Sequence, residues 1–262
     1  MPERTSYVHG TPSWADLGTT DPQAAKAFYG SIFGWEAKEQ DTPNGPYIMF
    51  YKGDKAVAAA MPLTEMEASR GVPPHWNTYI AVDDVGAAAT AATAAGGHVI
   101  VEPMEVMDAG KMAFVADPGG AVFGLWEAGN HIGAQLVNEH GALSWNELIT
   151  DDPDGAEEFY GKVLGWTTET AEMPAGPYTS WMVGESPVGG MMKKRTEMGP
   201  IPNVWGVYFG AGDCDACLED VKAAGGTVVM DPIEVPEVGR LAVVSDPQGA
   251  MFTVYTAANP TS

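Results

Sequence analysis

The sequence predicts an α+β protein in which four modules of order β-α-β-β-β make up two tandem domains. Two observations carry this prediction. The same landmarks occur twice along the 262 residues at a nearly constant spacing, and strand-like apolar runs alternate with amphipathic helices inside each copy. The length also suits two domains of ordinary size.

The repeat covers the whole chain. Its first landmarks are Trp14, Asp21-Pro22, Phe28-Tyr29-Gly30, Gly34-Trp35 and Gly45-Pro46-Tyr47, and all of them recur 131 residues later. Later landmarks, which include Trp76, Gly96-Gly97 and Asp117-Pro118-x-Gly120, recur 129 residues on, so the loop at residues 63–74 is two residues longer than its partner. This register predicts one domain at residues 1–130 and a second at residues 141–262, joined by a linker at residues 131–140.

Helices are predicted where a cap precedes an apolar stripe. Asp21 is expected to cap a helix that Pro22 begins and Gly34 ends, with Phe28 and Ile32 on its apolar face. The second copy repeats this helix from Asp152 to Gly165, and a further helix is expected from Asp84 to Gly96 and from Asp213 to Gly225. Strands are expected in the first copy at residues 47–51, 78–82, 98–101, 112–115 and 122–126.

The charge balance limits the partners. The chain holds 13 Lys and Arg against 35 Asp and Glu, and both copies are acidic, with 7 basic and 16 acidic side chains in residues 1–130 and 6 and 19 in residues 131–262. This balance argues against nucleic acid and anionic membranes. No apolar run is long enough to span a membrane, and no signal peptide is recognisable at the N-terminus. We therefore expect a cytoplasmic protein that is a monomer or a homodimer and does not bind membranes.

Cys214 and Cys217 have a CxxC spacing at a predicted helix start, where a thiolate would be stabilised. The first copy has Val85 and Ala88 at these positions, and both cysteines share an apolar helix face with Leu218. We therefore expect buried core thiols rather than a redox site.

The module order, the Phe-Tyr-Gly…Gly-Trp helix exit and the Asp-Pro-x-Gly hairpin resemble the glyoxalase/bleomycin-resistance/extradiol-dioxygenase superfamily, also called vicinal oxygen chelate (VOC). The resemblance covers nearly the whole chain and is greatest to two-domain, actinobacterial members described as glyoxalase-like or as hydroxylases. It implies that each domain is an open cup of mixed β-sheet with helices outside. In the family, such a cup holds a divalent metal and a small substrate.

The resemblance also locates the family's metal ligands. They would fall at Trp14, Asn77, Gly124 and within residues 57–61 in the first copy, and at Trp145, Gly206, Thr253 and within residues 188–192 in the second. The two short segments contain only Ala, Gly, Val and Met. Indole, glycine and alanine side chains do not ligate a hard cation, so we expect neither a metal nor another cofactor.

Residues two apart on a strand share a face. The first cup would then present Trp14 with Asp16, Asn77 with Tyr79, and Gly124 with Trp126; the second would present Trp145 with Glu147, Gly206 with Tyr208, and Thr253 with Tyr255. Aromatic walls around one acidic side chain suit a flat apolar or aromatic ligand.

Three functions remain open from the sequence. The first is metal-independent binding of a small molecule in one or both cups, for sequestration, resistance or an accessory role to an oxygenase. The second is a glyoxalase-like lyase or isomerase, or a hydroxylase-type enzyme, with Asp16 or Glu147 as its acid–base group. The third is a structural or interaction protein whose cups are filled by Trp14 and Trp145.

Overall fold

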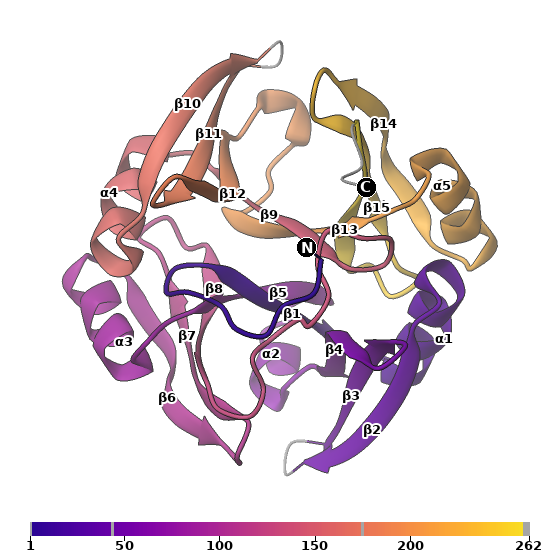
Figure 1. The fold of residues 1–262 in the computed structure, drawn as a ribbon, viewed down its shortest axis with the longest axis horizontal. Coiled ribbons are helices and arrows are strands. Elements are labelled where there is room, and N and C mark those ends of the chain that lie inside the picture. The colour runs from indigo at the N-terminus through magenta and orange to yellow at the C-terminus, as the bar shows by residue number, and fades with distance from the viewer. Residues whose placement is uncertain (1, 43–44, 174–175, 259–262) are drawn as a thin grey trace.

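A computed structural model describes residues 2–42, 45–173 and 176–258. Met1 and residues 259–262, the outer ends of the two predicted domains, lie outside the described residues, as do residues 43–44 and 174–175. The chain forms two eight-stranded mixed sheets, one from each repeat (Figure 1). The predicted α+β class and its four β-α-β-β-β modules are confirmed.

The elements follow one another in the same order in both repeats. The first contains β1 (Pro12–Thr19), α1 (Pro22–Phe33), β2 (Glu36–Thr42), β3 (Gly45–Lys52), β4 (Lys55–Pro62), α2 (Glu65–Ser69), β5 (His75–Ala81), α3 (Val85–Ala94), β6 (His98–Val106), β7 (Gly110–Ala116) and β8 (Val122–Ala128). The second contains β9 (Leu143–Thr150), α4 (Pro153–Leu164), β10 (Thr167–Met173), β11 (Gly176–Val183), β12 (Ser186–Lys193), the 3-10 turn η1 (Thr196–Met198), β13 (Val204–Gly210), α5 (Cys214–Ala223), β14 (Thr227–Val235), β15 (Gly239–Ser245) and β16 (Met251–Ala257).

Local sequence explains the first helix of each repeat. The Asp21 carboxylate accepts a hydrogen bond from the Ala24 N–H at 3.0 Å, Pro22 opens the helix, and Gly34 ends it with a φ of 70°. The copy α4 is capped in the same way. The longer loop after β4 contains α2, which a Thr64–Glu67 capping box begins, whereas its shorter counterpart contains only η1.

Each sheet has its first strand near the centre. In the first sheet the order is β2-β3-β4-β1-β5-β8-β7-β6, with β1 parallel to β4 and antiparallel to β5, and the second sheet repeats this order. Alternate residues of β1 face opposite sides. Trp14 and Asp16 lie on the concave side, which we call cup 1, while Ala15 and Leu17 join the core behind the sheet. Cup 2 is the matching concave face of the second sheet, with Trp145 and Glu147.

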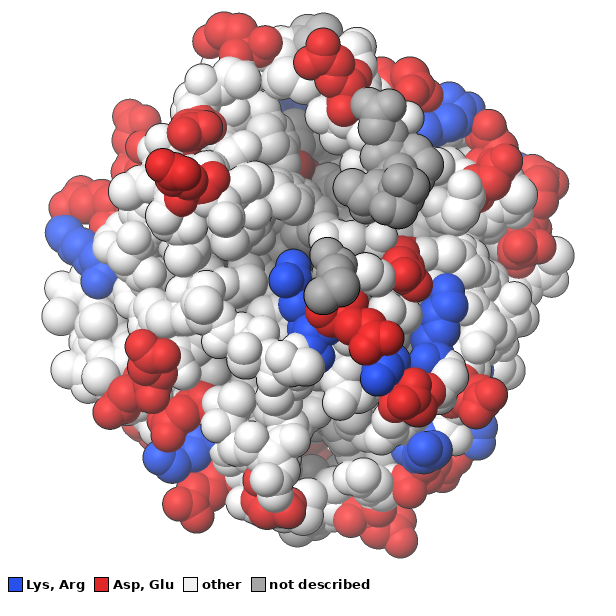
Figure 2. All heavy atoms as spheres, in the orientation of Figure 1, with Lys and Arg blue, Asp and Glu red and all other residues white. Residues whose placement is uncertain are grey.

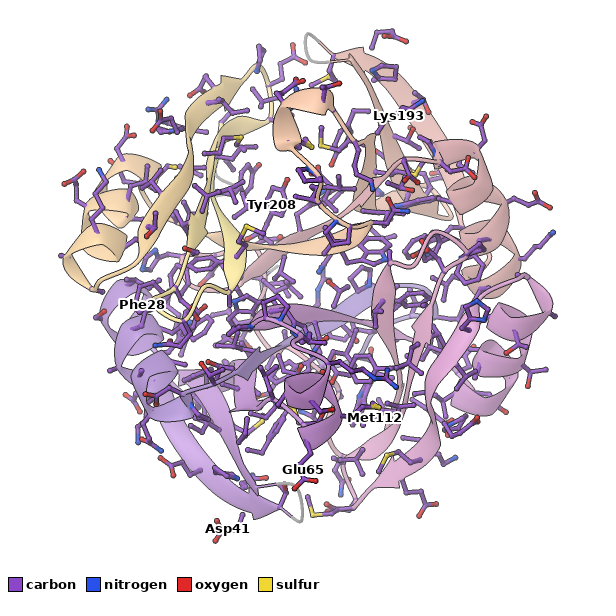
Figure 3. The ribbon with its side chains drawn as sticks, turned by 180° about the vertical axis from the view of Figure 1, so that it is seen from behind. Phe28, Asp41, Glu65, Met112, Lys193 and Tyr208 are labelled. Atoms are coloured by element: carbon purple, nitrogen blue, oxygen red, sulfur yellow. The ribbon has the colours of Figure 1, made fainter. Side chains whose placement is uncertain are left out.

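The two sheets pack with their convex sides toward each other, and the cups open away from the shared core (Figure 1). Helix α1 packs against α5 of the other repeat, and α3 packs against α4. One core cluster therefore combines Phe28 with Phe209 and Phe252, and Figure 3 shows Phe28 beside the second repeat. Cys214 and Cys217 belong to this cluster and are buried, as predicted; burial raises their pKa values to about 11 and about 12.

A reciprocal pair of hydrogen bonds joins the repeats inside this core. The Tyr29 hydroxyl donates to Asp246 at 3.1 Å, and the Tyr160 hydroxyl donates to Asp117, also at 3.1 Å. Each tyrosine accepts a hydrogen bond from the indole of Trp76 or Trp205 in its own repeat. The repeated Phe-Tyr-Gly motif thus binds the Asp-Pro-x-Gly hairpin of the other copy.

The segment between the repeats lies against cup 1. Its His131 ring packs edge-on against Trp14 with centroids 4.5 Å apart, and its backbone carbonyl accepts a hydrogen bond from the Trp126 indole. The Ala134 N–H donates to Ser13 O at 2.7 Å, and the Tyr7 hydroxyl donates to Ala134 O. This segment therefore closes one side of cup 1.

Acidic side chains are distributed over both repeats on the visible face, as the sequence counts indicate (Figure 2). In the part of the chain that the structure describes, no helix is long and apolar enough to cross a membrane.

The reciprocal tyrosine contacts predict a measurable cost of removing either hydroxyl. Tyr29→Phe and Tyr160→Phe should each lower the free energy of unfolding by about 1–3 kcal/mol, because each leaves a buried indole N–H without its acceptor. Urea unfolding measures this change. Tyr255→Phe is the control, since that hydroxyl bonds Val238 O at an exposed site and its loss should cost less than about 0.5 kcal/mol. Equal effects of all three substitutions would contradict the prediction.

Burial lowers the pKa of His131 from 6.5 to about 4. Between these pH values the unfolded chain binds a proton that the folded protein does not, so stability falls as the pH drops. We expect the wild type to lose about 1–2 kcal/mol relative to His131→Phe between pH 7 and pH 5. Chemical denaturation of both proteins at the two pH values measures the difference. If the free energies of unfolding of the two proteins changed by the same amount between these pH values, the prediction would be wrong.

Candidate functional site

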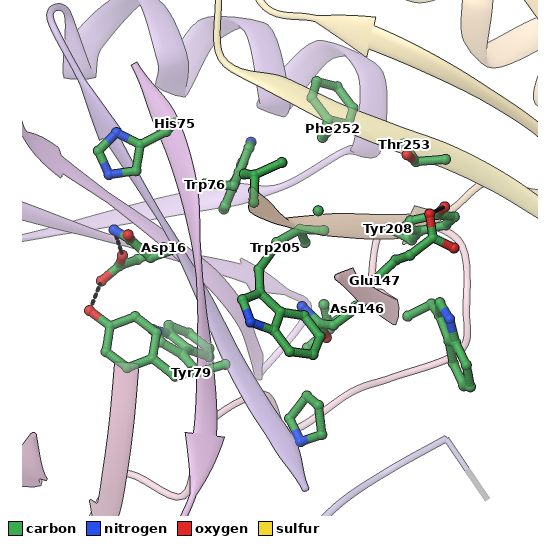
Figure 4. A pocket seen from close by; sticks show the side chains of 18 of the residues that line it. Asp16, His75, Trp76, Tyr79, Asn146, Glu147, Trp205, Tyr208, Phe252 and Thr253 are labelled. Carbon is green, nitrogen blue, oxygen red and sulfur yellow. Dashed lines mark hydrogen bonds between the residues drawn. The ribbon is translucent and has the colours of Figure 1, made fainter. Parts of the chain in front are cut away.

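Both cups hold a buried carboxylate among aromatic side chains (Figure 4). In cup 1, Asp16 is 2% exposed and accepts three hydrogen bonds. Asn77 Nδ2 donates to Oδ1 at 2.9 Å, and Tyr79 and Tyr47 donate to Oδ2 at 2.8 Å and 3.3 Å. Burial raises the pKa of Asp16, while these three donors and the charge of His75 oppose the increase.

In cup 2, Glu147 takes the place of Asp16 and is 7% exposed. The Tyr208 hydroxyl donates to Glu147 Oε1 at 2.8 Å, and the Tyr178 hydroxyl is a second donor. The Trp145 indole donates to the Tyr178 hydroxyl at 2.9 Å, and this hydroxyl also interacts with Glu147. Burial raises the pKa of Glu147, and the two tyrosines and the positive charge of Arg195 oppose this.

The two cups differ in the donor beside the carboxylate. Asn77 is the cross-strand partner of Asp16, and Gly206 is the cross-strand partner of Glu147. Gly206 has no side chain to donate. A Cβ added at Gly206 would meet only the Glu147 backbone oxygen, at 3.7 Å, so the space beside it is open.

The cups also differ in how far their walls are covered. In cup 1, Trp14, Tyr79 and Trp126 are 3%, 4% and 6% exposed. They form a buried cluster that includes Ala134 and Val137 of the linker. The counterparts in cup 2, which are Trp145, Tyr208 and Tyr255, are all partly exposed. They line a hollow of the second sheet, and Figure 3 shows Tyr208 directed into it.

Two glycines let tyrosine rings approach the carboxylates. A Cβ at Gly124 would lie 2.3 Å from the Tyr79 ring, and a Cβ at Gly190 would lie 1.9 Å from the Tyr178 hydroxyl. Both distances are too short for any other residue. The space that small residues leave on these strands is thus partly occupied by the protein's own tyrosines.

The residues at the family's metal positions do not fit a divalent ion. The side chains of Trp14, Gly124, Trp145 and Gly206 offer no oxygen or imidazole donor, which leaves the Asn77 amide oxygen in cup 1 and the Thr253 hydroxyl in cup 2. Among the described residues, no group of three or more His, Cys, Asp or Glu side chains lies close enough to hold a metal ion. Three or more convergent donors are what such an ion needs.

The structure brings together every residue that the sequence placed in the cups. Cup 1 collects Asp16 with Trp14, Asn77, Tyr79, Gly124 and Trp126, and cup 2 collects Glu147 with Trp145, Gly206, Tyr208, Thr253 and Tyr255. Sequence reasoning missed Tyr47 and Tyr178 as donors to the carboxylates. The signal was present, because Gly-Pro-Tyr recurs in both copies. It also missed Arg195, which lies on a loop without a counterpart in register.

Comparisons with known proteins agree with this fold. The chain is 48% identical over 261 residues to a Mycobacterium tuberculosis protein named "Putative glyoxylase CFP32", with 98% of this chain and 99% of that protein covered. It is 35% identical to the anthracycline biosynthesis protein DnrV of Streptomyces peucetius, with 95% and 94% covered. A Mn(II)-bound glyoxalase from Novosphingobium aromaticivorans has a similar structure, with a TM-score of 0.66, 16% identity, and 97% and 85% covered.

The family description "Glyoxalase/Bleomycin resistance protein/Dioxygenase superfamily" matches residues 11–125 and again residues 140–254. These two matches take up most of the chain and correspond to the two sheets. The chain therefore belongs to the glyoxalase/bleomycin resistance protein/dioxygenase superfamily, with two tandem domains of that fold.

Proposed function

We propose that cup 2 binds a small apolar or aromatic molecule without a metal ion, in a sequestering role or as an accessory to an oxygenase. One observation carries the proposal: a buried carboxylate lies at the base of partly exposed aromatic walls. Binding sites for small molecules combine a concave apolar lining with a few fixed polar groups. Cup 2 has this composition, whereas the walls of cup 1 are largely covered.

Exposed apolar side chains at the mouth of cup 2 continue the apolar surface of its aromatic walls. Val229 and Ile233 on β14 and Met251 at the start of β16 are 53%, 43% and 53% exposed, and all three line the same hollow. Exposed apolar side chains around a concave site are typical of ligand-binding grooves. A ligand longer than one ring would cover them.

The name of one relative supports this class of ligand. DnrV is named as an anthracycline biosynthesis protein, and an anthracycline is a flat, polycyclic aromatic molecule. The aromatic walls of cup 2 suit such a shape, because stacked and edge-on aromatic contacts add to the effect of burial.

A second candidate is acid–base catalysis by Glu147 on the bound molecule. Burial raises the pKa of this carboxyl, as it does for many catalytic acids and bases, and one relative is named as a glyoxylase. The two functions separate in one experiment. If cup 2 is catalytic, Glu147→Gln abolishes turnover of a methylglyoxal–thiol hemithioacetal; if it only binds, the wild type has no such turnover to lose.

Filling cup 2 should abolish binding. We expect Gly206→Leu to weaken the binding of 2-naphthol, a flat aromatic probe, at least tenfold, because the new side chain projects into open space beside Glu147. Tryptophan fluorescence titration measures the affinity. Gly212→Leu is the matched control, since it lies two residues beyond β13 and a Cβ there meets nothing within 4 Å. Equal binding by both variants would place the ligand outside cup 2.

Chelation should leave binding unchanged. The donors at the family's metal positions do not fit an ion, so dialysis against EDTA is expected to change the affinity for 2-naphthol less than about twofold. The same titration, repeated after adding Mn²⁺ or Zn²⁺, completes the measurement. Loss of binding in EDTA with recovery in either metal would overturn metal independence.

A further inference from the structure

The two cups are copies of one site, so each shows what the other lacks. In cup 1 the Asp16 carboxylate is bound by two tyrosine hydroxyls and by the Asn77 amide. In cup 2 both tyrosines are retained around Glu147, but Gly206 stands where the amide donor would be. Figure 4 shows Asp16 with Tyr79 and Glu147 with Tyr208.

From this difference we infer that the ligand of cup 2 donates a neutral hydroxyl or N–H hydrogen bond to Glu147, in the place that Asn77 occupies in cup 1. The inference rests on the proposed binding function and names the class of ligand that the site selects. Gly206 is then a specificity-determining residue, because without a side chain there the ligand can occupy the position beside Glu147 that corresponds to the Asn77 amide.

The hydrogen bonds in cup 2 leave a position on Glu147 for a further donor. Tyr208 donates to the carboxylate at 2.8 Å, and Tyr178, which accepts a hydrogen bond from Trp145, interacts with it as well. A carboxylate has about four lone-pair positions. With Tyr208 donating at 2.8 Å, acceptor capacity remains on this 7% exposed carboxylate, and a donor that displaces water from it has to replace the hydrogen bond that the water makes.

The local charge favours a neutral donor over an ammonium group. Arg195 already acts electrostatically on Glu147, and it lies on the loop that follows β12. Arg195, which is itself 3.6 Å from Glu197, already supplies a positive charge near Glu147, so a second cation gains less there than it would beside an isolated carboxylate. A phenolic or alcoholic hydroxyl, or an amide N–H, supplies the proton without that penalty.

Space is available for the donor. A Cβ at Gly206 would make only one contact, at an ordinary van der Waals distance, and no left-handed backbone conformation excludes other residues there. An asparagine can therefore be introduced at this position and would reproduce the donor of cup 1. The aromatic walls next to this space are partly exposed, which allows entry.

The test compares two probes of the same shape, 2-naphthol and 2-methoxynaphthalene, in fluorescence or calorimetric titrations at pH 8. Only the first donates a hydrogen bond. We expect the wild type to bind 2-naphthol at least tenfold more tightly, since a hydrogen bond to a charged group is among the stronger ones. In Gly206→Asn the preference should fall to about twofold or less, while Gly206→Ala, which adds volume without a donor, should retain it.

The outcomes separate the two proposals. If both probes bind the wild type equally, the inference about the donor fails and the binding function stands. If neither probe binds, the binding function fails and the inference with it. If a folded Gly206→Asn variant keeps the full preference for 2-naphthol over 2-methoxynaphthalene, the acceptor of the 2-naphthol hydroxyl does not lie beside Gly206. Because the comparison of the probes uses the natural chain, it remains decisive even where a variant does not fold.

Discussion

The structure depends on the core that the two repeats share. Tyr29 and Tyr160 each reach across to an aspartate of the other copy, and the apolar faces of the helices α1, α3, α4 and α5 join the same core from its two sides. Because the convex faces form this shared core, the two larger buried clusters lie outside the cups, and cup 1 has a smaller buried cluster of its own around Trp14. The cups are thereby left for other purposes, and the two repeats can diverge there while the shared core keeps both folded.

Within the cups, the acidic group lies two residues from the position that carries a metal ligand in the family. Trp14 and Trp145 occupy that position, and Asp16 and Glu147 follow on the same face of the strand. The tyrosines complete the change. As the rings stand, a Cβ at Gly124 or Gly190 would collide with Tyr79 or Tyr178, so these glycines leave room for the tyrosines beside the carboxylates. Hydroxyl and amide donors therefore surround these carboxylates in the described part of the chain.

Much of this was predictable, because it depends on local signals that occur twice. The caps at Asp21 and Asp152, the strand alternation that pairs Trp14 with Asp16, and the burial of Cys214 all follow from short-range patterns. Contacts between distant segments were not predictable in the same way. The packing of His131 on Trp14 joins residues 117 positions apart, and the hydroxyl of Tyr47 on β3 reaches Asp16 on β1 across the intervening strand β4. No periodicity in one sequence encodes such contacts.

The linker explains why the two cups are not equivalent. A tandem repeat has one segment between its copies, and here that segment hydrogen-bonds to β1 and β4 and covers the aromatic wall of cup 1. In the described part of the second repeat, Trp145, Tyr208 and Tyr255 stay partly exposed. The same covering also favours a fully bonded carboxylate: Asp16 has three donors because solvent and ligand have less access to it. Glu147 is reached from the open side, so a missing donor beside it is tolerable only if water or a ligand supplies one. The covered walls of cup 1 and the additional hydrogen-bond donor to Asp16 therefore have one origin, which is the order of the two copies along the chain.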